Sequence, residues 1–335
     1  MKSPITGKEM TIKKEYRTLT FRREEFKVLY HYFLCEDNKE QFTNAELDEI
    51  NLVQIYNQYR EVHKLPFPDE VIAIREKYKL PAIKMAEVLG FGVNVYRNYE
   101  AGEVPSESNA RLIQLAKDPN KFKELVEISG VYSGENLNRI SKNIDKLIEE
   151  DRKNSFKISF HEYLLGSKQP DVYSGYRKPC LEKLTEMVVF FTQELEPWKT
   201  KLNKLLFYAD FLQFRKTCFS VSGVRYRAID MGPVPNNFNS ILEYMANNDD
   251  VDIYQTEFPD GKIGEQFKPN SGRIFNPDIF KEDELQTLQE VVKRFGKTAT
   301  NDIINISHKE KAWEENFKAG KQLISYNYSF DLTAL

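Results

Sequence analysis

The stretch Leu80-Pro-Ala-Ile-Lys-Met-Ala-Glu-Val-Leu-Gly-Phe-Gly-Val-Asn-Val-Tyr-Arg-Asn-Tyr-Glu-Ala-Gly102 predicts two short helices joined by a tight turn. Ala86 provides the small side chain that two closely crossing helices need, and Gly90 suits the positive φ of the turn. The second helix is expected from about Val93 to Ala101, with Gly102 after it as a C-terminal capping glycine. This pattern is a helix-turn-helix.

The outward side of that second helix carries polar side chains where such helices reach base edges in a DNA major groove. Asparagine and arginine suit bidentate contact with adenine and guanine. Residues 61–129 hold ten basic and eleven acidic residues, so a DNA-binding surface requires cations gathered on one face and salt-sensitive affinity. A helical packet that binds only protein is the alternative interpretation. We predict DNA contacts from Lys84, Gly92, Val93, Asn94, Arg97 and Asn98.

The region from about Phe67 to Leu125 closely resembles the Cro/repressor-type (Xre-like) helix-turn-helix family. The residues that carry this resemblance are Ile72, Arg75, Ala86, Leu89-Gly90, Tyr99-Glu100-x-Gly102 and Pro105. The resemblance implies that Asn94, Arg97 and Asn98 contact bases or phosphates. Gly92 stands where the family usually has a Ser or Thr that caps the helix and touches phosphate.

The sequence before the helix-turn-helix predicts a small β lobe and a helix. Residues 10–34 read as strands, because aromatic and β-branched side chains recur at period two from Phe26. A helix is expected from about Ala45 to His63, opened by a capping-box pattern at Thr43 and Glu46. Further on, a helix from about Glu135 to Arg152 carries an apolar stripe that is typical of a core or dimer seam.

The opening of the chain also resembles the MqsA-like antitoxin architecture, in which two Cys-x-x-Cys pairs hold a structural zinc. The four equivalent positions here are Ser3, Thr6, Cys35 and Asn38, so a single thiolate remains. A tetrahedral zinc needs four Cys or His ligands. We therefore predict no zinc and no other cofactor, with this lobe held by its aromatic face, docking or dimerisation.

Three ordered motifs mark the C-terminal half. They are Lys201-Leu-Asn-Lys-Leu-Leu-Phe-Tyr208 on an amphipathic helix, Tyr226-Arg-Ala-Ile-Asp-Met-Gly-Pro-Val234 on a strand and turn, and Ser307-His308 with Trp313. A hairpin is expected near residues 261–275. Together, residues 180–325 resemble the Panacea domain, also met as the SocA-like or phage GepA-like domain.

That resemblance implies an antitoxin module that binds and neutralises a co-encoded toxin. The toxin partners of the family are unrelated to one another and include small alarmone synthetase-like enzymes and membrane-active peptides. Aromatic anchors and strand-edge cations suit a binding surface. We predict toxin contacts from Lys201, Lys204, Tyr208, Arg225, Arg227 and Pro233.

Composition sets the class of protein. The chain has 335 residues and a net charge of −3, and no apolar run approaches the ~18 residues of a membrane span. Three scattered cysteines and no secretory signal at the start are typical of a cytoplasmic protein. No phosphate loop, dinucleotide fingerprint, Gly-x-Ser-x-Gly or His-Glu-x-x-His motif occurs, so we expect no enzyme.

The sequence therefore predicts an α+β chain with segments 1–64 (β lobe and helix), 65–129 (helix-turn-helix), 130–179 (linker helices) and 180–335 (Panacea domain). The predicted function is a cytoplasmic, bacterial or phage-associated type II antitoxin that binds its toxin and operator DNA as a homodimer. The first alternative is a transcriptional regulator whose C-terminal half senses a ligand or phage protein. The second is an interaction scaffold that never binds DNA.

Overall fold

The structure, a computed structural model, describes residues 1–166 and 169–335 and confirms the α+β class. Helices predominate, and the described strands form three small sheets. The chain divides into two compact units, Met1–Phe156 (unit 1) and Lys157–Leu335 (unit 2), and each is described by itself. The division falls inside one long helix, whereas the sequence predicted boundaries near residues 64, 129 and 179. Residues 167–168 of the predicted linker lie outside the described residues.

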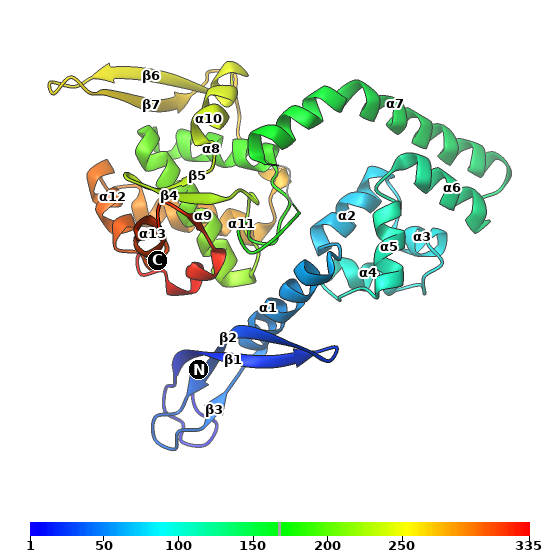
Figure 1. Ribbon diagram of the computed structural model, residues 1–335, viewed down its shortest axis with the longest axis horizontal. Helices are drawn as coiled ribbons and strands as arrows, with labels where there is room; N and C mark the ends of the chain where they lie inside the picture. The colour runs from blue at the N-terminus through cyan, green and yellow to red at the C-terminus, as the bar shows by residue number, and fades with distance from the viewer. Residues whose placement is uncertain (167–168) are drawn as a thin grey trace. The chain divides into compact units, whose positions relative to one another are not determined.

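Unit 1 begins with a twisted antiparallel sheet in the order β1-β2-β3. β1 (Thr11–Phe21) pairs along its whole length with β2 (Glu24–Leu34), and the short β3 (Gln41–Phe42) pairs with the end of β2 (Figure 1). These strands confirm the predicted β lobe. The hairpin turn consists of Arg22 and Arg23, both with positive φ (48° and 70°), so it carries no glycine or proline signal.

α1 (Ala45–His63) confirms the predicted helix and packs against β2. Its start differs from the prediction, because Asn44 is the N-cap and its side chain accepts a hydrogen bond from Leu47 N at 3.0 Å. The predicted capping box of Thr43 and Glu46 is therefore wrong. The first helical turn begins one residue later than that pattern requires.

A group of short helices follows α1 and includes the two predicted around Gly90. They are α2 (Pro68–Lys77), α3 (Ala82–Val88), α4 (Val95–Glu100), α5 (Glu107–Leu115) and α6 (Pro119–Ser129). Gly90 and Gly102 both have positive φ, 71° and 108°, as the turn and the helix end require. The buried side chains of Met85, Tyr96 and Phe122 join these helices into one core.

α7 (Gly134–Leu165) is longer than predicted and runs from unit 1 into unit 2. Its Ile140 and Ile144 are buried in the core of the short helices, which assigns the predicted apolar stripe to core packing. Residues 130–156, predicted as part of the linker helices, lie within unit 1. Across the described residues, no helix combines the length and apolar character needed to cross a membrane.

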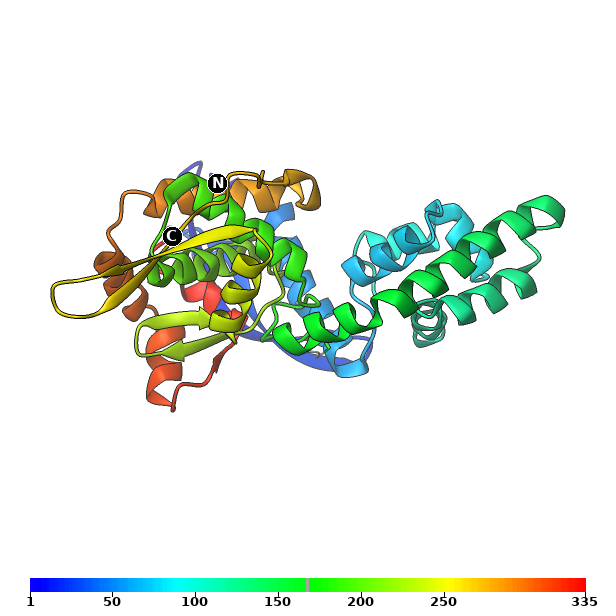
Figure 2. The same cartoon turned by 90° about the horizontal axis from the view of Figure 1, so that it is seen from above.

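Unit 2 consists of helices around a small sheet and a hairpin. Its helices are α8 (Leu181–Leu195), α9 (Lys199–Thr217), α10 (Phe238–Asn247), α11 (Glu282–Phe295), α12 (Thr300–His308) and α13 (Lys311–Lys318), with 3-10 turns η1 (Pro277–Ile279) and η2 (Tyr326–Asp331). The sheet has the order β5-β4-β8, from β4 (Tyr226–Ile229), β5 (Gly232–Pro235) and β8 (Leu323–Ile324). β6 (Val251–Glu257) and β7 (Ile263–Pro269) form the hairpin, which reaches beyond the helices of unit 2 (Figure 1, Figure 2).

The hairpin begins about ten residues earlier than predicted, because Gly261 lies in the turn between its strands and not at its start. α9 also differs from the expectation of a one-sided amphipathic helix. α8, α11, α12 and β5 pack around it, so its residues Lys201–Phe214 are buried on every side. α9 is the central helix of unit 2.

Candidate functional site

The three C-terminal motifs meet at one place inside unit 2. The Lys204 side chain, from α9, donates a hydrogen bond from Nζ to Pro233 O at 2.9 Å, at the start of β5. Gly232 has φ +96°, and a Cβ there would lie 2.5 Å from Lys204 Cε and 2.6 Å from Ser307 Oγ of α12. Elements that are far apart in the sequence therefore approach too closely for any residue but glycine.

The late Ser-His and Trp motif closes this cluster from one side. The rings of His308 and Trp313 stack with centroids 3.8 Å apart. Trp313 Nε1 donates to Ile229 O at 2.8 Å, which ties α13 to β4. Burial, with a smaller contribution from the charge of Lys204, lowers the pKa of His308, so its ring is neutral at pH 7.

Two buried acids hold the surrounding loops. Asp210 accepts hydrogen bonds from the backbone of Val221 and Ser222 (both 2.8 Å) and from Tyr226 OH (2.8 Å). Burial raises the pKa of Asp210, and these hydrogen bonds oppose that shift. Glu310 accepts from Ala334 N at 3.0 Å, which fastens the end of the chain. Both carboxylates therefore hold segments of unit 2 together.

The residues predicted to touch a toxin are mostly in the interior. Lys201 donates to Gly296 O and Thr298 O beyond the end of α11. Five of the six side chains are buried, and Arg227 alone of the set is exposed; the buried ones are Lys201, Lys204, Tyr208, Arg225 and Pro233. Their role in toxin contact stays a prediction, and the geometry limits the buried ones to shaping the surface that a partner would meet.

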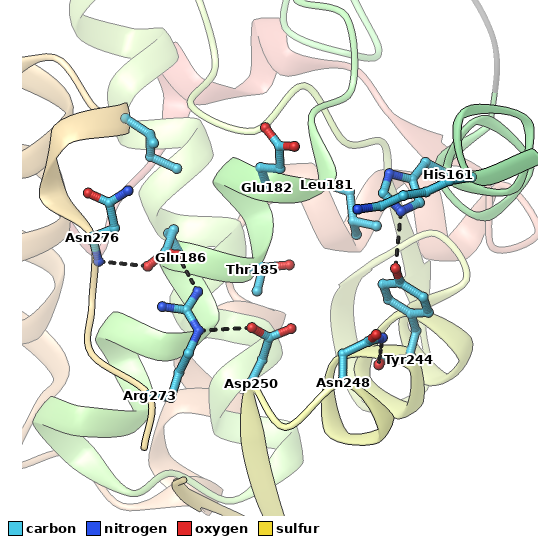
Figure 3. A pocket seen from close by; sticks show the side chains of 12 residues that line it. His161, Leu181, Glu182, Thr185, Glu186, Tyr244, Asn248, Asp250, Arg273 and Asn276 are labelled. Atoms are coloured by element: carbon cyan, nitrogen blue, oxygen red, sulfur yellow. Dashed lines mark hydrogen bonds and ion pairs between the residues drawn. The ribbon is translucent and has the colours of Figure 1, made fainter. Parts of the chain in front are cut away.

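A hollow of about 390 Å³, lined by both polar and apolar side chains, opens elsewhere in unit 2 (Figure 3). Arg273 crosses its floor, forming ion pairs with Glu186 and with Asp250 (2.9 Å). On the opposite wall His161 Nε2 and Tyr244 OH are 3.1 Å apart. Burial and, less strongly, a neighbouring lysine charge lower the pKa of His161. The lining residues are Lys157, His161, Leu181, Glu182, Thr185, Glu186, Tyr244, Asn248, Asp250, Arg273, Asn276 and Ile279.

Sequence reasoning missed this hollow. Its residues come from α7, α8, α10, the turn between α10 and β6, and the segment from Arg273 to the end of η1, without any shared spacing. Only the tertiary fold brings them together. No local sequence signal could have found them.

The predicted DNA-contact residues lie on and around α3 and α4, in the region predicted to be a helix-turn-helix. Two contacts hold α4 against α2. Tyr96 OH donates a hydrogen bond to Val71 O at 2.8 Å, and Glu100 forms an ion pair with Arg75 at 2.5 Å. Lys84, on α3, is half-exposed and pairs with Glu87 at 2.6 Å, so its charge is partly balanced. The remaining predicted residues are exposed, and they are Gly92, Val93, Asn94, Arg97 and Asn98.

The N-terminal lobe contains two turns with the same hydrogen-bond pattern, Ser3–Lys8 and Cys35–Glu40. In each turn, the backbone N–H of the first residue donates a hydrogen bond to the carbonyl of the last residue. The distances are 2.8 Å from Ser3 N to Lys8 O and 3.0 Å from Cys35 N to Glu40 O. The carbonyl of the first residue accepts a hydrogen bond from the fifth residue, at 2.9 Å from Gly7 N and at 2.8 Å from Lys39 N. The fifth residues, Gly7 and Lys39, both have positive φ. The two turns are therefore equivalent at the positions where a zinc knuckle carries its ligands.

The side chains at those positions face each other but do not suit zinc. Thr6 Oγ1 lies 3.6 Å from Cys35 Sγ. Hydrogen bonds from the hydroxyls of Thr6 and then Ser3 lower the pKa of the Cys35 thiol. Asn38 turns its amide to Glu40 instead. One thiol with two hydroxyls and an amide does not fit a structural zinc centre, which requires thiolate or imidazole donors.

Residues 202–314 match the model of the family described as antitoxin SocA-like, Panacea domain. This range covers less than half of the chain and includes nearly all of the three motif stretches that meet around Lys204. No curated protein shows significant similarity to the chain.

Proposed function

We propose that this chain is the antitoxin of a type II toxin-antitoxin system, and that unit 2 binds and neutralises a cognate toxin. The observation that carries the proposal is the Panacea match over residues 202–314, in which the motif residues form one interlocked centre. The centre is buried, so it supports a rigid outer surface rather than a reaction. Inhibition is by stoichiometric occlusion of the toxin, in the cytoplasm and without catalysis.

We also propose that unit 1 binds operator DNA and represses its own operon. The exposed α4 residues Asn94, Arg97 and Asn98 support this role, since a fixed core leaves them free to enter a major groove. The small net charge of residues 61–129 favours binding as a homodimer on two half-sites.

Co-expression tests the toxin part. Each protein encoded beside this chain is expressed alone and together with the full chain. One of them is expected to arrest growth, and the full chain is expected to restore growth and to co-purify with it in a fixed ratio. The candidate toxins include small alarmone synthetase-like enzymes. If no neighbouring gene product is toxic, or if none forms a complex, the antitoxin proposal fails.

A gel shift on the promoter of the operon tests the DNA part. The double change Arg97→Ala and Asn98→Ala should abolish the shift at a salt concentration where the unchanged chain binds. Arg152→Ala, on the exposed side of α7 in the same unit, removes the same charge and should leave binding unchanged. Equal binding by the double variant would rule out these two residues as DNA contacts, and no shift by the unchanged chain would favour the interaction scaffold.

One observation favours the regulator as a second candidate function. The hollow between α7, α8 and α10 has the size and mixed polarity of a small-ligand site. A sensor would respond to a ligand there with altered operator affinity and would need no toxin. Growth rescue separates the candidates, because a sensor rescues no toxin.

A further inference from the structure

The two long strands of the N-terminal lobe differ in how their outer edges are covered. On β2, α1 supplies side-chain amides along the edge. Asn51 accepts from His31 N (2.8 Å) and donates to His31 O (2.9 Å), and Gln54 makes the same two bonds with Leu29 at 3.0 Å. Helix side chains therefore satisfy the edge of β2 as a further strand would.

β1 has no such cover along its other edge within the described residues, where β2 is its only strand neighbour. The strand is eleven residues long, contains neither Gly nor Pro, and is exposed over most of its length. Ile12 and Tyr16 are 57% and 65% exposed. A long regular edge with exposed apolar side chains is a template for pairing with another strand.

The parity of the ladder shows which groups point outward. His31 and Leu29 direct their backbone groups to α1, so by alternation the even-numbered residues of β2 bond to β1. Those residues face the odd-numbered residues of β1 in the pairing register. The even-numbered residues of β1 therefore direct their N–H and C=O groups away from β2, and they are Ile12, Lys14, Tyr16, Thr18 and Thr20.

The charges of β1 are complementary to a second copy of itself in one register. If two β1 strands pair antiparallel around a twofold axis at Tyr16, Thr11 faces Phe21 and the whole strand is used. In this register Glu15 of each copy faces Arg17 of the other. These two are already neighbours on one face of the strand, with the guanidinium 2.6 Å from the carboxylate. Pairing would build an alternating quartet of two carboxylates and two guanidinium groups.

Neighbouring registers are disfavoured by like charges. A shift of two residues one way places Glu15 opposite Glu15 and Lys13 opposite Arg17. The same shift the other way places Arg17 opposite Arg17. Like charges directly opposite each other destabilise strand pairs, and opposite charges stabilise them. The sequence of charges along β1 thus favours the register centred on Tyr16, in which every residue of β1 also has a partner in the second copy.

We propose that two copies of this chain associate through their β1 edges, antiparallel and centred on Tyr16, to form one continuous six-stranded sheet. The occupant of the edge is a second copy of the chain. Each of the five facing pairs of outward-pointing residues exchanges two main-chain hydrogen bonds, and Tyr16 lies against Tyr16 of the second copy. This surface gives a physical basis to the homodimer of the proposed function, on which it rests for its role.

Charge reversal tests the surface on the full chain, with mass measured by light scattering at about 1–50 μM. The unchanged chain is expected to be dimeric. Glu15→Arg and Arg17→Glu each place like charges in register and should raise the dimer dissociation constant at least tenfold. The double variant restores opposite charges and should recover most of the affinity. Glu25→Arg makes the same charge change on β2, away from the free edge, and should leave the dimer unchanged.

A cysteine scan tests the register. Only the residue on the twofold axis faces itself, so Tyr16→Cys should give a disulfide-linked dimer under mild oxidation. Residue 18 faces Lys14 of the second copy, so Thr18→Cys should not form a disulfide-linked dimer. A monomeric unchanged chain overturns the proposal. A dimer that tolerates both charge reversals overturns this surface but leaves dimeric DNA binding intact, so the two failures are distinguishable.

Discussion

Lys204 lies in the middle of unit 2, and its ammonium donates to the carbonyl of Pro233. Burial lowers the pKa of Lys204 to about 7. In the unfolded chain a lysine titrates near 10.4. Between these values the unfolded state binds more protons, so the stability of unit 2 should rise as the pH increases from about 7 toward 10.

Lys204→Met keeps the chain length of the side chain and removes the buried charge. The variant should be more stable at pH 7, by an amount on the order of a few kcal/mol, because desolvation of the ammonium is relieved. It should also lose the rise in stability between pH 7 and 9. Urea unfolding at the two pH values measures both effects. Lys309→Met, at an exposed lysine, is the matched control, and an equal pH dependence in the Lys204 variant would contradict the assignment.

Gly232 is required by the same cluster. Gly232→Ala forces a methyl group against Lys204 and Ser307 at a φ of +96°, and we expect a loss of about 2–4 kcal/mol in unfolding free energy. Gly261→Ala is the control, since Gly261 also has positive φ but open space around it, and it should cost only about 1 kcal/mol. Similar losses for the two variants would show that backbone strain, rather than the close approach, makes Gly232 necessary.

The elements with local signals were predictable. α1 and the helices on either side of Gly90 were predicted because apolar spacing, prolines and turn glycines act within a few positions. The turn at Arg22 and Arg23 was not, since two arginines with positive φ resemble no turn pattern. The burial of α9 was also missed: lysines at positions 201 and 204 predict an exposed side, and only the carbonyls that accept from them allow burial.

The two matching turns of the N-terminal lobe give a further prediction. Changing Ser3, Thr6 and Asn38 together to cysteine places four thiols at equivalent positions of Ser3–Lys8 and Cys35–Glu40. The triple variant should bind one zinc per chain and raise the melting temperature of unit 1, because a structural zinc contributes directly to folding. Metal content after dialysis measures binding. A variant with only Ser3 and Thr6 changed should bind more weakly, and equal metal content in all variants would contradict the geometric equivalence.

At the scale of the molecule, the structure changes where the chain should be cut. The sequence placed the start of the C-terminal domain at residue 180, but earlier residues are part of unit 2. Tyr176 is buried and stacks on Phe214, and Asp171 pairs with Arg225 at 2.6 Å. Upstream, Leu164 O accepts a hydrogen bond from Asn237. The predicted linker thus contributes core contacts to the domain that follows it.

Two fragments test this division. Residues 157–335 should fold cooperatively and neutralise the toxin as the full chain does, because unit 2 is intact. Residues 180–335 lose the Tyr176 and Asp171 contacts and should melt at a lower temperature, with reduced rescue of growth. Circular dichroism melts and co-expression measure the two effects. Residues 1–156 are the complementary control, which should retain operator binding and β1-mediated dimerisation but rescue no growth. Equal stability of the two C-terminal fragments would return the boundary to residue 180, and rescue by residues 1–156 would move toxin binding to unit 1.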